Sequence, residues 1–147
     1  MSSDQTALNR ELPEVPLHEF LGIELDPSLY SSGGNVVRIE LPLTDRLRGA
    51  AMPVHGGVLS SLMDIACGQV AAGGTEMWER GAFPVTTDLH IRYFRQPDNG
   101  PLIVEARSRH RGKRLISVEC TVSDGDGKEL TSATATYMVI EGALPPL

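Results

Sequence analysis

Hydrophobic positions between residues 57 and 72 surround a helix and are not confined to one side of it. The apolar members are Val58, Leu59, Leu62, Met63, Ile65, Ala66, Cys67, Val70 and Ala71. A surface helix would show an apolar stripe and a polar face, so the pattern predicts a helix that is buried nearly all round. Its length of about 24 Å is short of a membrane span, and its polar residues are Ser60, Ser61, Asp64 and Gln69. We expect a core helix.

Strands are predicted on both sides of this helix. The run 37–41 alternates apolar and charged residues, which is typical of a half-exposed strand. After the helix, stretches rich in Val, Ile, Thr and Tyr cover residues 84–94, 102–109, 115–123 and 129–140. Turn residues separate them at 98–101, 111–112 and 124–127. Because short connections join antiparallel neighbours, we expect these four strands to form a meander.

A short helix is predicted near the start of the chain. Apolar residues at helical spacing over 17–21 stop at Gly22, and glycine is typical of a helix C-terminus. Residues 1–14 are polar and mixed in charge, which predicts a flexible N-terminal arm. We expect one domain over 15–142 and a C-terminal tail over 143–147. The fold class is α+β, with one antiparallel sheet wrapped around one long central helix.

Composition and charge narrow the class of protein. The chain has 147 residues, of which 41% are hydrophobic and 22% charged, and this fits one globular domain. The formal net charge of -6 argues against a nucleic-acid partner, because such binding relies on cations that neutralise phosphates. The start of the chain has no basic segment followed by an apolar run, the mark of a secretory signal. We expect a cytoplasmic protein without a membrane partner.

The histidines and cysteines show no spacing typical of metal ligands. The four histidines fall on separate predicted elements, without HxxxH or HExxH spacing. Cys67 and Cys120 lie far apart in apolar runs and form no CxxC pair. We therefore expect no metal site, no cofactor and no disulfide framework, and we interpret Cys67 as part of the core.

Paired glycines and one isolated carboxylate are the candidate chemistry. Gly56 and Gly57 open the buried helix, so unpaired N–H groups at the positive end of the helix dipole are open to a ligand, as in an oxyanion hole. Asp64 is the only charged residue between His55 and Glu76, and a carboxylate there costs free energy unless it is paired or used. A structural interpretation stays open: the glycines form a tight turn, Asp64 bonds a neighbouring Ser or Thr, and His55 caps the helix.

These residues resemble a known family. The string HGG at 55–57, followed after six residues by Asp64, resembles the signature of hotdog-fold acyl-CoA thioesterases of the phenylacetate-degradation (PaaI-like) type. Weaker similarities extend over residues 17–140, at 20–25, 86–89, Tyr93, Pro97, 111–114 and 124–127. The resemblance implies a hotdog fold and hydrolysis of a small, medium or aromatic acyl-CoA to the free acid and coenzyme A.

The resemblance also implies catalytic roles. Asp64 would act as general base on a water or as nucleophile on the thioester carbonyl. The Gly56 N–H would be the oxyanion donor, and His55 would position the thioester group. Thr86 would orient the carboxylate or the lytic water. These roles are physically coherent, because the donors act on charge that develops in the transition state.

The family commonly has Asn or Gln at the position that is Gly49 here. The second contact to the oxyanion is therefore open, and either Arg48 or a water would replace it. We count Arg48 and Gly57 among the predicted substrate-binding residues.

A basic segment follows in the second half of the chain. Residues 107–114 hold five of the thirteen Lys and Arg. Taken alone, this segment fits a solvated hairpin tip. With the resemblance, Arg111, Lys113 and Arg114 become predicted contacts to the phosphates of coenzyme A, held by charge-assisted hydrogen bonds.

The predicted sheet also favours self-association. An exposed strand edge and a helix that is apolar on nearly all sides would both be covered by a second copy. The resemblance implies a homodimer with one continuous sheet and active sites between subunits, often paired into a homotetramer.

Two alternatives to a hydrolase function stay open. A non-catalytic acyl-CoA-binding or sensor domain would release no thiol, and a hotdog hydratase places its His and acid differently.

Overall fold

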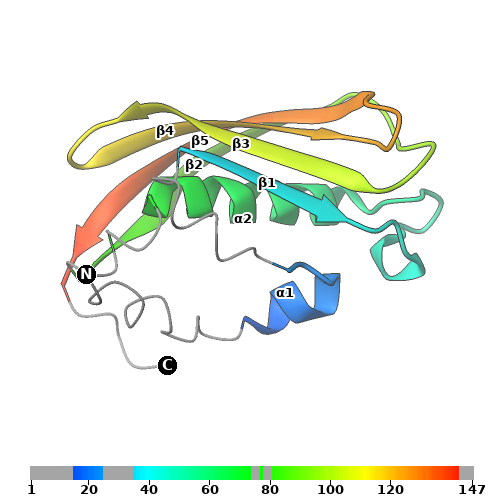
Figure 1. The fold of residues 1–147 in the computed structure, drawn as a ribbon, viewed down its shortest axis with the longest axis horizontal. Helices are drawn as coiled ribbons and strands as arrows, with labels where there is room; N and C mark the ends of the chain where they lie inside the picture. Colours follow the sequence, from blue (N-terminus) through cyan, green and yellow to red (C-terminus); the bar gives the residue numbers. More distant parts are fainter. Residues whose placement is uncertain (1–14, 25–34, 74–76, 78–80, 143–147) are drawn as a thin grey trace, which may run out of the picture.

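One antiparallel sheet of five strands lies along the long helix α2 (Gly56–Ala72) (Figure 1). This computed structural model describes residues 15–24, 35–73, 77 and 81–142. The predicted N-terminal arm and C-terminal tail lie outside the described residues, and the domain limits stay a prediction. The predicted fold class, one antiparallel sheet on one long helix, is confirmed.

The observed elements follow the predicted ones closely. In chain order they are α1 (Pro16–Leu21), β1 (Val36–Leu41), the 3-10 helix η2 (Asp45–Leu47), α2, β2 (Ala82–Tyr93), β3 (Leu102–Arg111), β4 (Leu115–Ser123) and β5 (Glu129–Glu141). Helix α1 begins at a proline and ends at Gly22, whose φ of 78° lies in the left-handed region that favours glycine.

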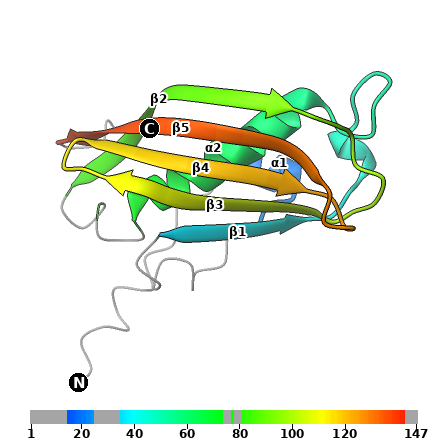
Figure 2. The same cartoon turned by 90° about the horizontal axis from the view of Figure 1, so that it is seen from above.

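The predicted four-strand meander is wrong in one respect. The strand order is β1-β3-β4-β5-β2, which Figure 2 shows from above. Only β3, β4 and β5 are successive neighbours; β2 pairs with β5, from Ala82↔Glu141 to Tyr93↔Thr131. The connection over 94–101 is longer than the roughly two to five residues of a hairpin loop. It crosses the end of the sheet and leaves β2 as an edge strand.

The core lies between α2 and one face of the sheet. Strand β1 alternates exposed and buried residues, and β4 and β5 likewise send every second residue toward the helix. In α2 only Gly57 is exposed, while a stripe that includes Ser61, Asp64 and Gly68 is half-buried. The prediction of burial nearly all round is thus wrong for a single chain, because only the face toward the sheet is fully buried, and Asp64 lies on the other, half-buried side. Among the described residues, no helix is both long and apolar enough to cross a membrane.

Candidate active site

His55 caps the N-terminus of α2 with its side chain. Its Nδ1 atom accepts a hydrogen bond from the Gly57 N–H at 2.8 Å. An accepting Nδ1 carries no proton, so the neutral ring carries its proton on Nε2. The ring therefore has a donor left for a ligand. The structural and the functional interpretation of His55 are compatible, because the two ring nitrogens serve different partners.

The two glycines after His55 are needed for different reasons. A Cβ on Gly57 would lie 3.0 Å from His55 Nδ1 and would displace the capping ring. A Cβ on Gly56 would meet only the Tyr93 ring, at an ordinary 3.7 Å. Neither glycine has a positive φ. The fold thus requires Gly57 for the cap, whereas the missing side chain of Gly56 chiefly leaves its N–H open to approach.

The first N–H groups of α2 are not all used. The Gly57 N–H donates to the His55 ring, and the Val58 N–H donates to the His55 carbonyl at 2.9 Å. Within the described part of the chain, the Gly56 N–H donates to no protein atom. The Tyr93 hydroxyl donates at 3.1 Å to the Gly56 carbonyl, which lies in the next peptide unit, and so holds the start of the helix. The Gly56 N–H is therefore an available donor at the positive end of the helix dipole.

The loop that precedes His55 packs against its backbone. A side chain at Gly49 would lie over the backbone of His55, because a Cβ there would be 3.5 Å from the His55 Cα. Arg48, the predicted substitute, is exposed and pairs with Asp45 at 3.6 Å. Sequence reasoning missed Gln96, whose Oε1 accepts from the Val54 N–H at 3.0 Å. Gln96 holds the loop just ahead of the predicted oxyanion donor.

Asp64 is held by two neutral hydroxyl groups. The Thr86 hydroxyl donates to Asp64 Oδ1 at 2.9 Å, and the Tyr137 hydroxyl reaches the same oxygen at 2.9 Å. Among the described residues no Lys or Arg forms an ion pair with Asp64, and Oδ2 accepts no hydrogen bond. The predicted contact between Thr86 and the carboxylate is present. Its second oxygen, Oδ2, therefore has no partner among the described residues.

Sequence reasoning missed Tyr137. Its side chain is buried on β5, and its hydroxyl also lies 3.0 Å from the main-chain carbonyl of Asp64. Burial, and after it the negative charge of Asp64, raises the pKa of Tyr137, so the phenol keeps its proton and donates. The sequence did contain a signal for it. In the last predicted strand a tyrosine occupies an inward position among small and aliphatic residues, and a buried tyrosine hydroxyl needs a hydrogen-bond partner.

The two halves of the predicted site are far apart within one chain. Gly56 contacts the end of β2 through Tyr93, and Asp64 contacts its middle through Thr86. The two α2 residues are eight positions apart, about 12 Å along the helix axis. A reacting carbonyl oxygen must lie about 3 Å from its oxyanion donor, while the carboxylate must reach the carbonyl carbon directly or through one water. One chain cannot provide both contacts to one carbonyl.

The basic segment divides into two parts. The Arg111 guanidinium donates to the carbonyls of Val70 at 2.5 Å and Ala71 at 3.0 Å, at the C-terminal end of α2. A cation there satisfies carbonyls that the helix leaves unpaired. Lys113 and Arg114 are exposed between β3 and β4. Arg111 thus has a structural contact that the sequence did not predict, and its predicted phosphate contact remains a prediction.

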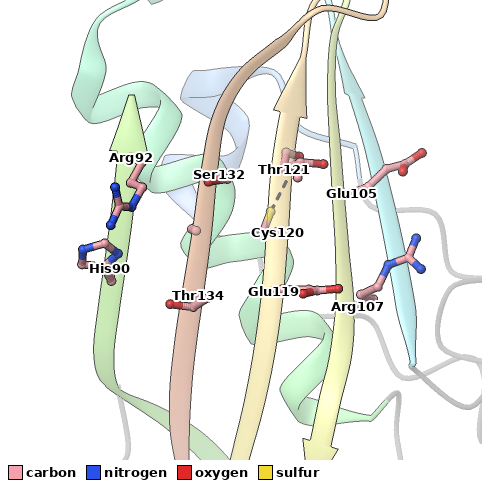
Figure 3. Close-up of a pocket in the computed structure, with 10 residues that line it drawn as sticks. His90, Arg92, Glu105, Arg107, Glu119, Cys120, Thr121, Ser132 and Thr134 are labelled. Carbon is pink, nitrogen blue, oxygen red and sulfur yellow. Dashed lines mark hydrogen bonds between the residues drawn. The ribbon is translucent and has the colours of Figure 1, made fainter. Parts of the chain in front are cut away.

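A groove of about 450 Å³ lies on the face of the sheet turned away from α2 (Figure 3). None of the predicted site residues lines it; its lining is His90, Arg92, Glu105, Arg107, Glu119, Cys120, Thr121, Ser132, Ala133 and Thr134. Its carboxylates pair with exposed arginines, Glu105 with Arg38 at 3.8 Å and Glu119 with Arg109 at 3.5 Å. The sheet separates this groove from Asp64. Among the described residues, no group of three or more His, Cys, Asp or Glu is placed to hold a metal ion.

The sequence matches the family model of the Thioesterase superfamily over residues 54–131, which is more than half of the chain and includes His55, Gly56 and Asp64. The chain belongs to this superfamily. With its sheet wrapped on α2, it is a hotdog-fold thioester hydrolase.

Three relatives illustrate the similarity. The Saccharolobus solfataricus protein SSO1253 is named as an esterase. It is 29% identical to this chain over 132 residues, which cover 90% of this chain and 83% of SSO1253. The medium/long-chain acyl-CoA thioesterase YigI of Salmonella typhimurium is 33% identical over 97 residues, 58% of this chain and 62% of its own. The structure of the Bacillus halodurans protein BH2602 with CoA has a TM-score of 0.70 and 26% identity, and covers 86% of this chain and 77% of its own. The phenylacetate-degradation type stays a prediction.

Proposed function

We propose that this chain hydrolyses acyl-CoA, with Asp64 as general base or nucleophile. One observation carries the proposal: Oδ1 of Asp64 accepts two hydroxyl donors at 2.9 Å, while Oδ2 has no described partner. An oxygen without a protein partner on this half-buried residue is open to a water or a substrate. Such a carboxylate oxygen can take a proton from water or attack a carbonyl carbon.

The N-terminus of α2 supplies the complementary half of the chemistry. The Gly56 N–H is the oxyanion donor, and the Nε2 proton of His55 is directed at the thioester group. Both donors are fixed before the substrate arrives, the first by the helix and the second by the hydrogen bond from Gly57 to Nδ1. Such preorganised donors stabilise the charge that develops in the transition state.

A second copy of the chain completes the site. Because Gly56 and Asp64 of one chain are about 12 Å apart, Asp64 of one subunit works with Gly56 of its partner. Strand β2 is an edge of the sheet and carries Thr86, so a copy that pairs along β2 brings its own residues close to Asp64. A homodimer is the minimum, and a dimer of dimers extends it. A monomeric variant with full activity would contradict this arrangement.

The substrate class is a medium-chain acyl-CoA in the first instance. The sequence resemblance predicts small, medium or aromatic acyl groups, and YigI is named for medium and long chains, so medium chains are common to both. Lys113 and Arg114 are the exposed cations for the phosphates of coenzyme A, and the observed contact of Arg111 makes it the weaker candidate.

The test is a panel of acyl-CoAs with thiol release as the readout, supplemented by a binding measurement. We expect turnover of at least one medium-chain substrate and a loss of roughly 100-fold or more in Asp64→Asn. Asp88→Asn, an exposed aspartate on the same strand as Thr86, is the matched control and keeps its rate. Binding without thiol release across the panel would favour the acyl-CoA sensor instead.

A further inference from the structure

Thr86 and Tyr137 are direct partners in the sheet. They face each other in the register of β2 and β5, and the register shifts immediately afterwards, between Thr86 and Asp88. A β-bulge of this kind re-aims side chains next to it. The pairing places both hydroxyls on the helix side of the sheet, where each lies 2.9 Å from the same oxygen of Asp64.

The two hydroxyl donors differ in how firmly they are held. Thr86 is exposed on the edge strand, whereas the Tyr137 side chain is 2% exposed and packs in the core. A Cβ on Gly68 would lie at 3.8 Å from the Tyr137 ring, so the ring rests against α2 one turn after Asp64. The position of the Tyr137 hydroxyl is therefore fixed by packing, and Thr86 adds a second donor from the surface.

Both donors are neutral, so neither cancels the charge of a carboxylate as an arginine would. Because both donors use Oδ1, they hold that oxygen and leave Oδ2 without a partner among the described residues.

We propose that Tyr137 is a positioning residue that acts through Asp64. Together with Thr86, it holds Oδ1 so that Oδ2 alone meets the lytic water or the thioester carbonyl. This inference rests on the proposed role of Asp64. A merely structural Tyr137 would instead tie β5 to α2 through the Asp64 main-chain carbonyl, and the two roles predict different kinetics.

The test compares the kinetics of Tyr137→Phe with those of wild type in acyl-CoA hydrolysis. We expect kcat to fall about 10-fold or more with KM within about twofold. Thr87→Val is the control, since its hydroxyl bonds the Thr136 carbonyl and not Asp64.

Two further variants separate positioning from packing. In an Asp64→Asn background, Tyr137→Phe lowers the residual rate little further, because residues that act as a unit are non-additive. Replacing Tyr137 by 4-aminophenylalanine keeps a donor in the same ring and restores much of the lost rate. If the Phe variant fails to fold, the amino variant still decides, because its weaker donor lowers kcat and leaves KM within about twofold of wild type.

The outcomes distinguish this inference from the function on which it rests. A Tyr137→Phe variant with unchanged kcat, beside an inactive Asp64→Asn, overturns the role of Tyr137 and leaves the proposed function standing. An equal loss from Tyr137→Phe in both backgrounds also overturns it, in favour of packing. A fully active Asp64→Asn overturns both.

Discussion

Asp64 in the middle of α2 and Asp124 at the turn between β4 and β5 are held in opposite ways. Asp124 is fully buried, and both of its oxygens are used. Its Oδ1 accepts from the N–H groups of Asp126 and Lys128 at 3.0 Å, and its Oδ2 from the N–H of Asp98 at 3.4 Å. Asp64 is half-buried, and within the described ranges only Oδ1 has partners, both of them side-chain hydroxyls.

The difference shows how environment separates a structural carboxylate from a reactive one. Backbone N–H groups hold Asp124 as part of a turn, so both of its carboxylate oxygens already accept hydrogen bonds within the fold. Burial alone would raise the pKa of Asp124, but the N–H donors of Lys128, Asp98 and Asp126 outweigh it and hold the pKa below its usual range. Asp64 Oδ2 has no hydrogen-bond partner among the described residues, and we expect this oxygen to react.

The largest expected effect is on the activity of Asp64→Asn. The amide keeps an oxygen acceptor for the hydroxyls of Thr86 and Tyr137, so the fold is retained, while the basic oxygen is lost. We expect thiol release to fall roughly 100-fold or more with a Tm close to wild type. A large fall in Tm with proportional loss of activity would place Asp64 with Asp124 as a structural residue.

Asp124→Asn should show the reverse. Its amide group meets backbone donors that need an acceptor, so we expect a clearly lower Tm and a rate per folded molecule close to wild type. Because the pKa of Asp124 is lowered in the folded state, its contribution to stability is present above the unfolded value of about 3.9 and is lost as the pH falls through the folded value. Unfolding curves at pH 7 and pH 3 should therefore differ more for wild type than for the variant.

Gly57→Ala moves the cap of α2 without touching Asp64. The new Cβ, 3.0 Å from His55 Nδ1, displaces the ring, and we expect kcat/KM to fall about 10-fold because the Nε2 donor moves with it. The gain in helix propensity from glycine to alanine offsets the lost cap, so Tm should change little. The imidazole 15N shifts would report the loss of the Gly57 hydrogen bond, and unchanged shifts would contradict the assigned tautomer.

The smallest expected effects fall in the basic segment. Lys113→Ala and Arg114→Ala should raise KM for acyl-CoA a few-fold, about two- to fivefold each, and the difference should shrink at high salt because exposed charges are screened. Arg111→Ala should lower Tm instead, since its guanidinium holds the carbonyls of Val70 and Ala71. A KM equal to that of wild type for Lys113→Ala and Arg114→Ala, at low and at high salt, would remove this segment from coenzyme A binding.

Much of the fold followed from local pattern. The presence of the long helix α2, the bounds of β4 and the glycine end of α1 were predicted because each depends on residues close in the sequence. The position of β2 beside β5 was not, because a connection over 94–101 carries no signal for its partner strand.

The candidate site was likewise predictable only where it depends on residues close in the sequence. The glycine pair, His55 and Asp64 stand within ten residues of one another and form a recognisable string, and the contact from Thr86 followed from the resemblance. Tyr137 reaches Asp64 across 73 residues of sequence, through a register and a bulge that no local pattern specifies. The use of both oxygens by Asp124, and of one by Asp64, is likewise a property of three-dimensional packing.

The most direct test of the account is the ratio of two rates, those of thiol release from one medium-chain acyl-CoA by Asp64→Asn and by Asp124→Asn, each per mole of folded protein. The account predicts that Asp64→Asn is slower by roughly 100-fold or more. Equal rates for the two variants would contradict it.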